Sequence, residues 1–148
     1  AEVVAVDIAP SLLAVAAERA LAELAPRIAY RAGDMADPAH GRFDFAVAMD
    51  SLIHYAPRDI AGALARLAAN VEHRIAFTIA PRTPLLTAMH LAGKAFPRSD
   101  RSPAIRPVSA GAIARLVAAE PCLAGWTAHA GLRVSSGFYI SQAMEITR

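Results

Sequence analysis

The sequence predicts an α/β domain whose mostly parallel sheet ends in an antiparallel hairpin. Between residues 2 and 79, short apolar stretches typical of strands alternate with longer stretches of helical spacing. This alternation implies parallel strands joined by right-handed crossovers. Near the C-terminus, two strand-like segments, 125–134 and 138–147, are separated only by Ser135-Ser136-Gly137. A link this tight suits an antiparallel pair.

The composition indicates one well-packed domain. The chain has 148 residues, of which 55% are hydrophobic and 19% charged, and this balance argues against disorder. The single cysteine excludes an internal disulfide and suits a reducing compartment. No run of about 18 uncharged apolar residues is present, so we expect no membrane span. The net charge is only +2, but residues 82–106 hold five basic side chains and one acidic one.

The first strand and helix are read from residues 2–24. Residues 2–6, EVVAV, are typical of a buried strand, which Asp7 ends. Pro10 suits the first turn of a helix, because a proline needs no backbone N–H there. Leucines and alanines then recur at helical spacing up to Leu24, so we expect a helix over 10–24.

The central strands follow in the same way. Residues 28–32 predict a short strand closed by Gly33-Asp34-Met35, and residues 37–41 predict a turn. Within the next strand, 43–49, residues 45–49 are all apolar, which suits a strand covered on both faces. Pro57 begins a helix to about residue 69, and residues 74–79 form a fourth strand.

The alternation changes after residue 81. Thr83-Pro84 predicts the start of a helix that runs to about Phe96. Residues 97–107 contain three prolines and three arginines and predict an irregular crossing segment. Ser109 is expected to cap a further helix that ends near residue 119.

A polar cluster follows the 43–49 strand. Asp50, Ser51, His54 and Tyr55 come directly after the apolar run. Open α/β sheets bind ligands at the carboxyl ends of their strands. His54 is therefore a candidate functional group, although a histidine near a helix start also serves as ordinary packing.

Two further acids follow strands. Asp7 stands where a carboxylate accepts hydrogen bonds from a ribose diol, and it also suits a helix N-terminus, where the helix dipole favours negative charge. Asp34, after Gly33, suits a nucleoside or an ordinary turn. The Gly-rich loop that such folds place after their first strand is absent, so we expect a fragment that lacks that strand and loop.

Three sequence blocks carry a family resemblance. They are MDSLIHY (49–55), FTIAPRTPLL (77–86) and GKAFPRSDRSP (93–103). In these blocks the chain resembles the magnesium-protoporphyrin IX methyltransferase family of chlorophyll and bacteriochlorophyll biosynthesis. The resemblance implies a class I methyltransferase fold that is Rossmann-like and has three αβα layers. It also implies one truncated domain over 1–148, with a substrate-side helix and loop insertion over 83–107.

The resemblance also implies a reaction and its residues. S-adenosyl-L-methionine (SAM) would be the co-substrate, no metal would be bound by the protein, and the methyl group would pass to a propionate of Mg-protoporphyrin IX. Asp7 and Ile8 would hold the ribose, while Gly33, Asp34 and Met35 would hold the adenine. Asp50 and Ser51 would flank the methionine end, and His54 matches the histidine that acts in the family. A separate hypothesis is that one or more of Arg82, Arg98 and Arg101 bind the porphyrin carboxylates, because paired guanidinium donors match carboxylates. Tyr55 is a further candidate for the substrate. The alternative for the arginines is an ordinary solvated loop, since charged runs usually face water.

Other functions remain open from the sequence. They are a SAM-dependent methyltransferase of another carboxylate or phenol, a nucleotide-binding oxidoreductase that uses Asp7 for NAD, and a basic scaffold for nucleic acid or acidic membrane. Aromatic residues are not interleaved with the basic segment, so we expect no nucleic-acid partner. We expect a cytoplasmic protein with at most a peripheral association with the photosynthetic membrane, and magnesium chelatase is a candidate partner that hands over the porphyrin.

Overall fold

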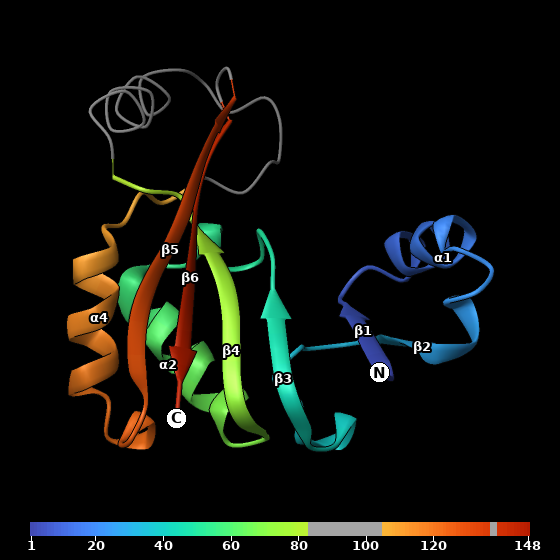
Figure 1. The fold of residues 1–148 in the computed structure, drawn as a ribbon, viewed down its shortest axis with the longest axis horizontal. Coiled ribbons are helices and arrows are strands. Elements are labelled where there is room, and N and C mark those ends of the chain that lie inside the picture. The colour runs from blue at the N-terminus through green and yellow to red at the C-terminus, as the bar shows by residue number, and fades with distance from the viewer. Residues whose placement is uncertain (83–104, 137–138) are drawn as a thin grey trace. The chain divides into compact units, whose positions relative to one another are not determined.

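The computed structural model describes residues 1–82, 105–136 and 139–148. These residues form two compact units, Ala1–Arg42 and Phe43–Arg148 (Figure 1). The helix predicted over 83–96 and most of the insertion predicted over 83–107 lie outside the described residues. No helix among the described residues is long and apolar enough to cross a membrane.

The unit Ala1–Arg42 is a parallel strand pair with a crossover helix. Strand β1 (Val3–Asp7) pairs with β2 (Ile28–Ala32), in a register that sets Asp7 opposite Ala32. Strand β2 has the predicted bounds, and β1 is shifted by one residue from the predicted 2–6, so that Asp7 is its last residue. Helix α1 (Pro10–Arg19) connects them, with Pro10 in its first turn.

The helix predicted over 10–24 is too long. Helix α1 ends at Arg19, because Ala20 is extended, with φ −62° and ψ 136°. The chain then turns through an N–H···O bond of 2.8 Å from Leu24 to Leu21 and a 3₁₀ turn over Ala25–Arg27. Bonds between residues three apart keep nearly helical spacing, so the leucine pattern does not reveal where the helix stops.

The unit Phe43–Arg148 contains a mixed four-stranded sheet in the order β3-β4-β6-β5 (Figure 1). Strands β3 (Phe43–Ala48) and β4 (Val71–Ile79) are parallel. Strand β6 (Tyr139–Thr147) is antiparallel to both β4 and β5 (Thr127–Ser136). The closing antiparallel hairpin is therefore confirmed.

The core of this unit lies between the sheet and two helices, α2 (Pro57–Ala68) and α4 (Ala110–Ala119), which contact each other. Ser109 caps α4 as predicted, since its side chain accepts a bond from the Ala112 N–H. Apolar side chains from all these elements are buried, including Ile60, Leu64, Ile75, Phe77, Ile79, Ile113, Val117, Met144 and Ile146. Helical spacing in α2 and α4 and alternation in β4 produce this layer.

Within the described residues of Phe43–Arg148, strand β3 is covered on one face, whereas the sequence predicts a strand covered on both. Ala48 is 4% exposed, whereas Phe45, Val47 and Met49 are 63%, 70% and 66% exposed. Within the described part of Phe43–Arg148, β3 is an edge strand and both helices pack on the Ala48 side. An unbroken apolar run cannot show this, because both faces of the strand carry apolar residues.

The chain returns to the carboxyl end of β4 after the undescribed segment. Pro81 and Val108 form a parallel bridge, with an N–H···O bond of 3.1 Å from Arg82 to Val108. The Arg106 N–H also donates to the Ile53 carbonyl at 2.8 Å. Both flanks of the segment 83–104 are thus anchored beside the residues that follow β3 and β4.

Candidate functional site

The centre of the candidate site is Asp50, two residues after the end of β3. Its backbone lies in the left-handed region, with φ 52°, and it is the one residue other than glycine with a positive φ in the described ranges. Its N–H donates to the Thr78 Oγ1 at 2.7 Å, and the Thr78 hydroxyl donates to the Asp50 Oδ1 at 2.9 Å. The hydroxyl of one buried threonine therefore fixes both the backbone and the carboxylate of Asp50.

A tyrosine from the closing hairpin completes this arrangement. The Tyr139 hydroxyl lies 3.1 Å from the Asp50 Oδ2 and 3.4 Å from its Oδ1. The three side chains come from β4, β6 and the segment after β3, so they converge only in the folded sheet. We name Asp50, Thr78 and Tyr139 the Asp50 cluster.

Two members of the Asp50 cluster, Thr78 and Tyr139, are not predicted from the sequence. Thr78 is the one hydroxyl in the apolar stretch 75–81, which is a signal that could have marked it. Tyr139 has no such signal, because its contact with Asp50 spans 89 residues and depends on the pairing of β6 with β4.

The residues after Asp50 form a short turn. The Ser51 hydroxyl donates to the Met49 carbonyl at 3.0 Å, and the 3₁₀ turn Leu52–His54 buries Leu52. His54 and Tyr55 are half-buried. The His54 Nδ1 is buried and has no hydrogen-bond partner among the described residues. A buried polar atom of this kind calls for a partner, which a ligand or water supplies.

The Asp50 carboxylate retains capacity to bind a ligand. A carboxylate offers about four lone-pair directions. The structure shows two close hydroxyl donors, Thr78 and Tyr139, and Asp50 itself is exposed. The carboxylate is thus held in one orientation and can still accept a hydrogen bond from a cationic group.

The acids of Ala1–Arg42 lie together at one edge of their strand pair. Asp7 ends β1, and the Gly33 N–H donates to the Asp7 carbonyl at 3.0 Å. The Asp7 Oδ1 accepts from the Ala9 N–H at 2.8 Å, and the Asp34 Oδ1 accepts from the Ala36 N–H at 2.9 Å. Each carboxylate therefore closes a turn with one oxygen. The ribose and adenine roles expected for Asp7 and Asp34 stay predictions.

The other predicted site residues differ in their settings. Ile8 is 83% exposed beside Asp7, and Met35 is half-buried after Asp34. Gly33 has φ 149°, a conformation that glycine adopts without strain. Arg82 is exposed next to the Pro81 bridge. Arg98 and Arg101 lie outside the described residues.

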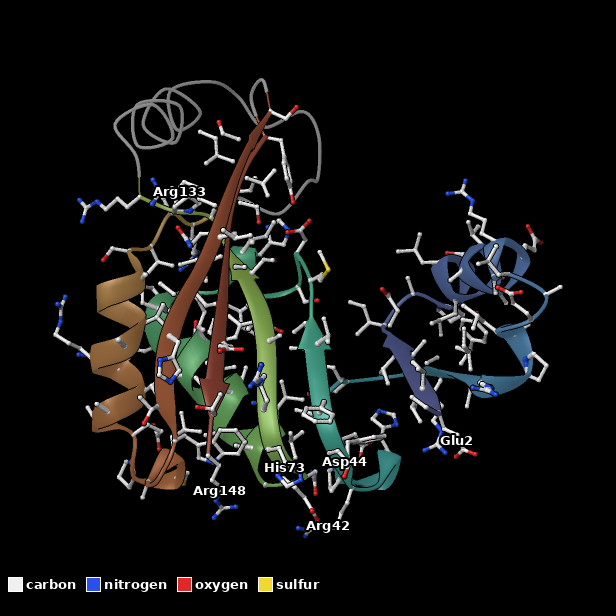
Figure 2. All side chains as sticks on the ribbon, viewed as in Figure 1. Glu2, Arg42, Asp44, His73, Arg133 and Arg148 are labelled. Carbon is white, nitrogen blue, oxygen red and sulfur yellow. The ribbon has the colours of Figure 1, made fainter. Side chains whose placement is uncertain are left out.

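A second polar cluster lies at the opposite end of β3 and β4. Potential ligand atoms of Asp44, Glu72 and His73 lie within 4.8 Å of one another, and all three residues are exposed. Figure 2 shows Asp44 and His73 near the amino ends of these strands. Because Asp50 follows the carboxyl end of β3, this second cluster is not part of the candidate site.

Comparison with solved structures identifies the class of fold. The fold matches magnesium-protoporphyrin IX methyltransferase from Synechocystis PCC 6803 with bound S-adenosylhomocysteine (SAH), with a TM-score of 0.79, 24% identity and coverage of 100% of this chain and 64% of that one. It also matches a putative O-methyltransferase from Nostoc punctiforme, with a TM-score of 0.71, 18% identity and coverage of 100% and 44%. Residues 1–73 match the methyltransferase domain family. The fold is that of class I SAM methyltransferases.

The sequence comparisons then define the family. Residues 48–148 match the family described as magnesium-protoporphyrin IX methyltransferase C-terminus. A magnesium-protoporphyrin O-methyltransferase from Rhodobacter capsulatus is 43% identical over 151 residues, which cover 98% of this chain and 62% of the relative. This chain belongs to the magnesium-protoporphyrin IX methyltransferase family. It spans 62% of the length of that curated relative.

Proposed function

We propose that the complete protein transfers the methyl group of SAM to a propionate carboxylate of Mg-protoporphyrin IX and forms the monomethyl ester. The observation that carries this proposal is the match of residues 48–148 to that family. The Asp50 cluster lies within the matched residues, at the strand edge where α/β folds bind ligands.

The adenosyl part of SAM fits the residues that follow β1 and β2. We assign the ribose to Asp7 and Ile8, and the adenine to Gly33, Asp34 and Met35. A carboxylate accepts hydrogen bonds from a diol or from an exocyclic amine. The Asp7 and Asp34 side chains each also accept a backbone N–H that closes a turn. The exposed Ile8 offers an apolar surface beside the sugar.

The methionine part fits the segment after β3. We assign it to Asp50 and Ser51. The Asp50 carboxylate is held by Thr78 and Tyr139, so it is already oriented before a cation arrives. Preorganised charge of this kind costs little reorganisation when the ligand binds.

The reaction places few demands on acid–base chemistry. SAM supplies an electrophilic methyl group on a sulfonium. A propionate has a pKa near that of a free carboxyl, about 4 to 5, and is ionised at neutral pH. The protein must hold the carboxylate oxygen in line with the methyl group at about 3 to 3.5 Å and exclude water. We therefore assign His54 to positioning the propionate by a hydrogen bond or to contacting the chelated magnesium of the substrate.

Replacing His54 by alanine should lower kcat about 10- to 100-fold at every pH tested, because misplacement of a reacting group costs this much. The measurement is kcat for the complete protein between about pH 6 and 9, a range that spans the ordinary pKa of histidine. H54N, which retains a hydrogen-bond donor, should recover part of the loss. A deficit that disappears at high pH would contradict positioning and indicate a general base.

We propose that the carboxylates of the porphyrin are bound by Tyr55, Arg82, Arg98 and Arg101. Single alanine substitutions of these arginines should raise the apparent Kd for Mg-protoporphyrin IX about 10-fold, since each removes a charge-assisted hydrogen bond. Absorbance titration of the porphyrin measures this change. Arg58→Ala, an exposed arginine on α2, is the control. If all three variants bound the porphyrin as tightly as R58A, the assignment would be wrong.

The decisive test is a methyl-transfer assay on the complete protein with labelled SAM. Mg-protoporphyrin IX and metal-free protoporphyrin IX are compared as acceptors. Label in the Mg-porphyrin ester alone supports the proposed reaction and shows that the enzyme recognises the magnesium of the substrate. Equal labelling of both acceptors still supports the proposed reaction, but it shows that His54 does not act by contacting magnesium. No labelling in either would contradict the proposed acceptor, and other carboxylates and phenols would be tested next.

The partners and location follow from this substrate. A large apolar porphyrin favours direct transfer from the enzyme that inserts the magnesium, so we propose contact with magnesium chelatase. We propose a cytoplasmic protein whose membrane contact is at most peripheral. The family match disfavours the oxidoreductase alternative, because it identifies a methyltransferase instead of an NAD enzyme.

A further inference from the structure

Through the Asp50 cluster, a tyrosine of the closing hairpin bonds to Asp50, a residue of the proposed SAM site. We propose that Thr78 and Tyr139 are positioning residues that orient the Asp50 carboxylate to receive the ammonium group of the methionine part of SAM. This inference rests on the proposed function and adds two residues to its cofactor site. Both hydroxyls bond to the Asp50 carboxylate, so each is assigned to act on the ligand through Asp50.

Thr78 fixes Asp50 from the neighbouring strand. Its hydroxyl accepts the Asp50 N–H at 2.7 Å and donates to the Asp50 Oδ1 at 2.9 Å. A hydroxyl can do both at once, because it has one proton and two lone pairs. The pair of bonds links the backbone at φ 52° to the side chain of the same residue. The Thr78 side chain on β4 therefore sets the orientation of the Asp50 carboxylate, and this carboxylate does not have to reorient when SAM binds.

Tyr139 reaches Asp50 because β6 extends beyond the end of β4. Ile79, the last residue of β4, pairs with Gln142, so Tyr139 lies three residues further along β6. Three strand residues correspond to about 10 Å. The overhanging phenol then meets Asp50, which lies two residues beyond the end of β3. The register of β6 together with the length of the tyrosine side chain thus brings Tyr139 to the edge where the parallel strands end.

The remaining acceptor capacity of Asp50 favours an ammonium group over the sulfonium. An ammonium carries N–H donors that match carboxylate lone pairs, whereas a sulfonium carries none. Both hydroxyls approach the carboxylate as donors and leave its negative charge in place. The geometry therefore suits one more charge-assisted hydrogen bond, from a cation that can donate.

The tyrosine can be changed with little effect on the fold. Tyr139 is 50% exposed, so the phenylalanine variant Y139F leaves no cavity in the core. Asp50 is also exposed and can replace that donor with water. Removal of the Thr78 hydroxyl differs, because Thr78 is 8% exposed and the Asp50 N–H would lose its acceptor.

The experiment is calorimetric titration of the complete protein with SAM and with SAH, for wild type and Y139F. SAM and SAH share the ammonium group, and SAH lacks the sulfonium. We expect Y139F to weaken both ligands by the same factor, about 3- to 10-fold, with Tm unchanged. Y30F is the matched control, since Tyr30 has only a long 3.4 Å bond to the Ala16 carbonyl. It should bind both ligands as wild type does.

Two results would overturn the inference. Y139F with wild-type affinity for both ligands would show that the tyrosine does not position Asp50. A loss confined to SAM would place the carboxylate at the sulfonium. The serine and valine variants of Thr78 give an independent test: T78S should retain SAM affinity, and T78V should lose it. Equal affinity of T78S and T78V would overturn the role of Thr78. Wild-type protein that fails to bind SAM would instead contradict the proposed function itself.

Discussion

Asp50→Asn should weaken SAM binding by about 10- to 100-fold, because a hydrogen bond to a charged partner contributes roughly 1.5–3 kcal/mol. Asparagine tolerates the left-handed backbone that Asp50 adopts at φ 52°. Its amide oxygen can still accept from Thr78. The substitution therefore removes the negative charge and leaves the backbone in place. Calorimetric titration of the complete protein measures the change.

The matched control for Asp50→Asn is Asp44→Asn. Asp44 lies on the same strand but at its amino end, and it is exposed (Figure 2). D44N should bind SAM as wild type does. D50A would also lower stability, because alanine is strained at this φ. SAM affinity of D50N equal to that of D44N would show that Asp50 does not contact the cofactor.

Phe77→Ala should lower the free energy of unfolding by about 3–5 kcal/mol, the cost of a large cavity in a packed core. Phe77 is 2% exposed and pairs with Ala48 on β3 and Met144 on β6. It thus lies in the middle of the sheet, on the face that the helices cover. Typical domains are stable by only about 5–15 kcal/mol, so this loss is large. Urea denaturation followed by circular dichroism measures it.

Phe45→Ala provides the comparison within the same sheet. Phe45 is 63% exposed on the other face of β3, where its ring contacts His73 at a centroid distance of 5.8 Å. Its truncation should cost about 1 kcal/mol or less, as for most surface substitutions. If F45A and F77A destabilised the complete protein equally, the exposed face of β3 would be buried in that protein.

Much of the fold follows from local patterns. Proline at the start of α1 and α2, serine before α4 and apolar strands that end in acids predict the order of elements correctly. These signals are local, because they depend on backbone restrictions and on one hydrogen bond near each helix end. The predicted end of α1 is wrong, and within Phe43–Arg148 strand β3 is covered on one face instead of two. Turn spacing imitates helix spacing in the first case, and an apolar run hides which face is covered in the second.

Some residues of the candidate site can likewise be predicted from local sequence, and others cannot. The sequence by itself determined that Asp7, Asp34 and Asp50 follow strands, because a polar residue after an apolar run marks the strand end. Only the tertiary structure decided that Thr78 and Tyr139 hold the Asp50 carboxylate. Those contacts span 28 and 89 residues and depend on the register of β4 with β3 and β6. Each strand's hydrophobic pattern favours one register, but which residues then meet across β3, β4 and β6 depends on all three strands together, so the sequence near Asp50 does not reveal its partners.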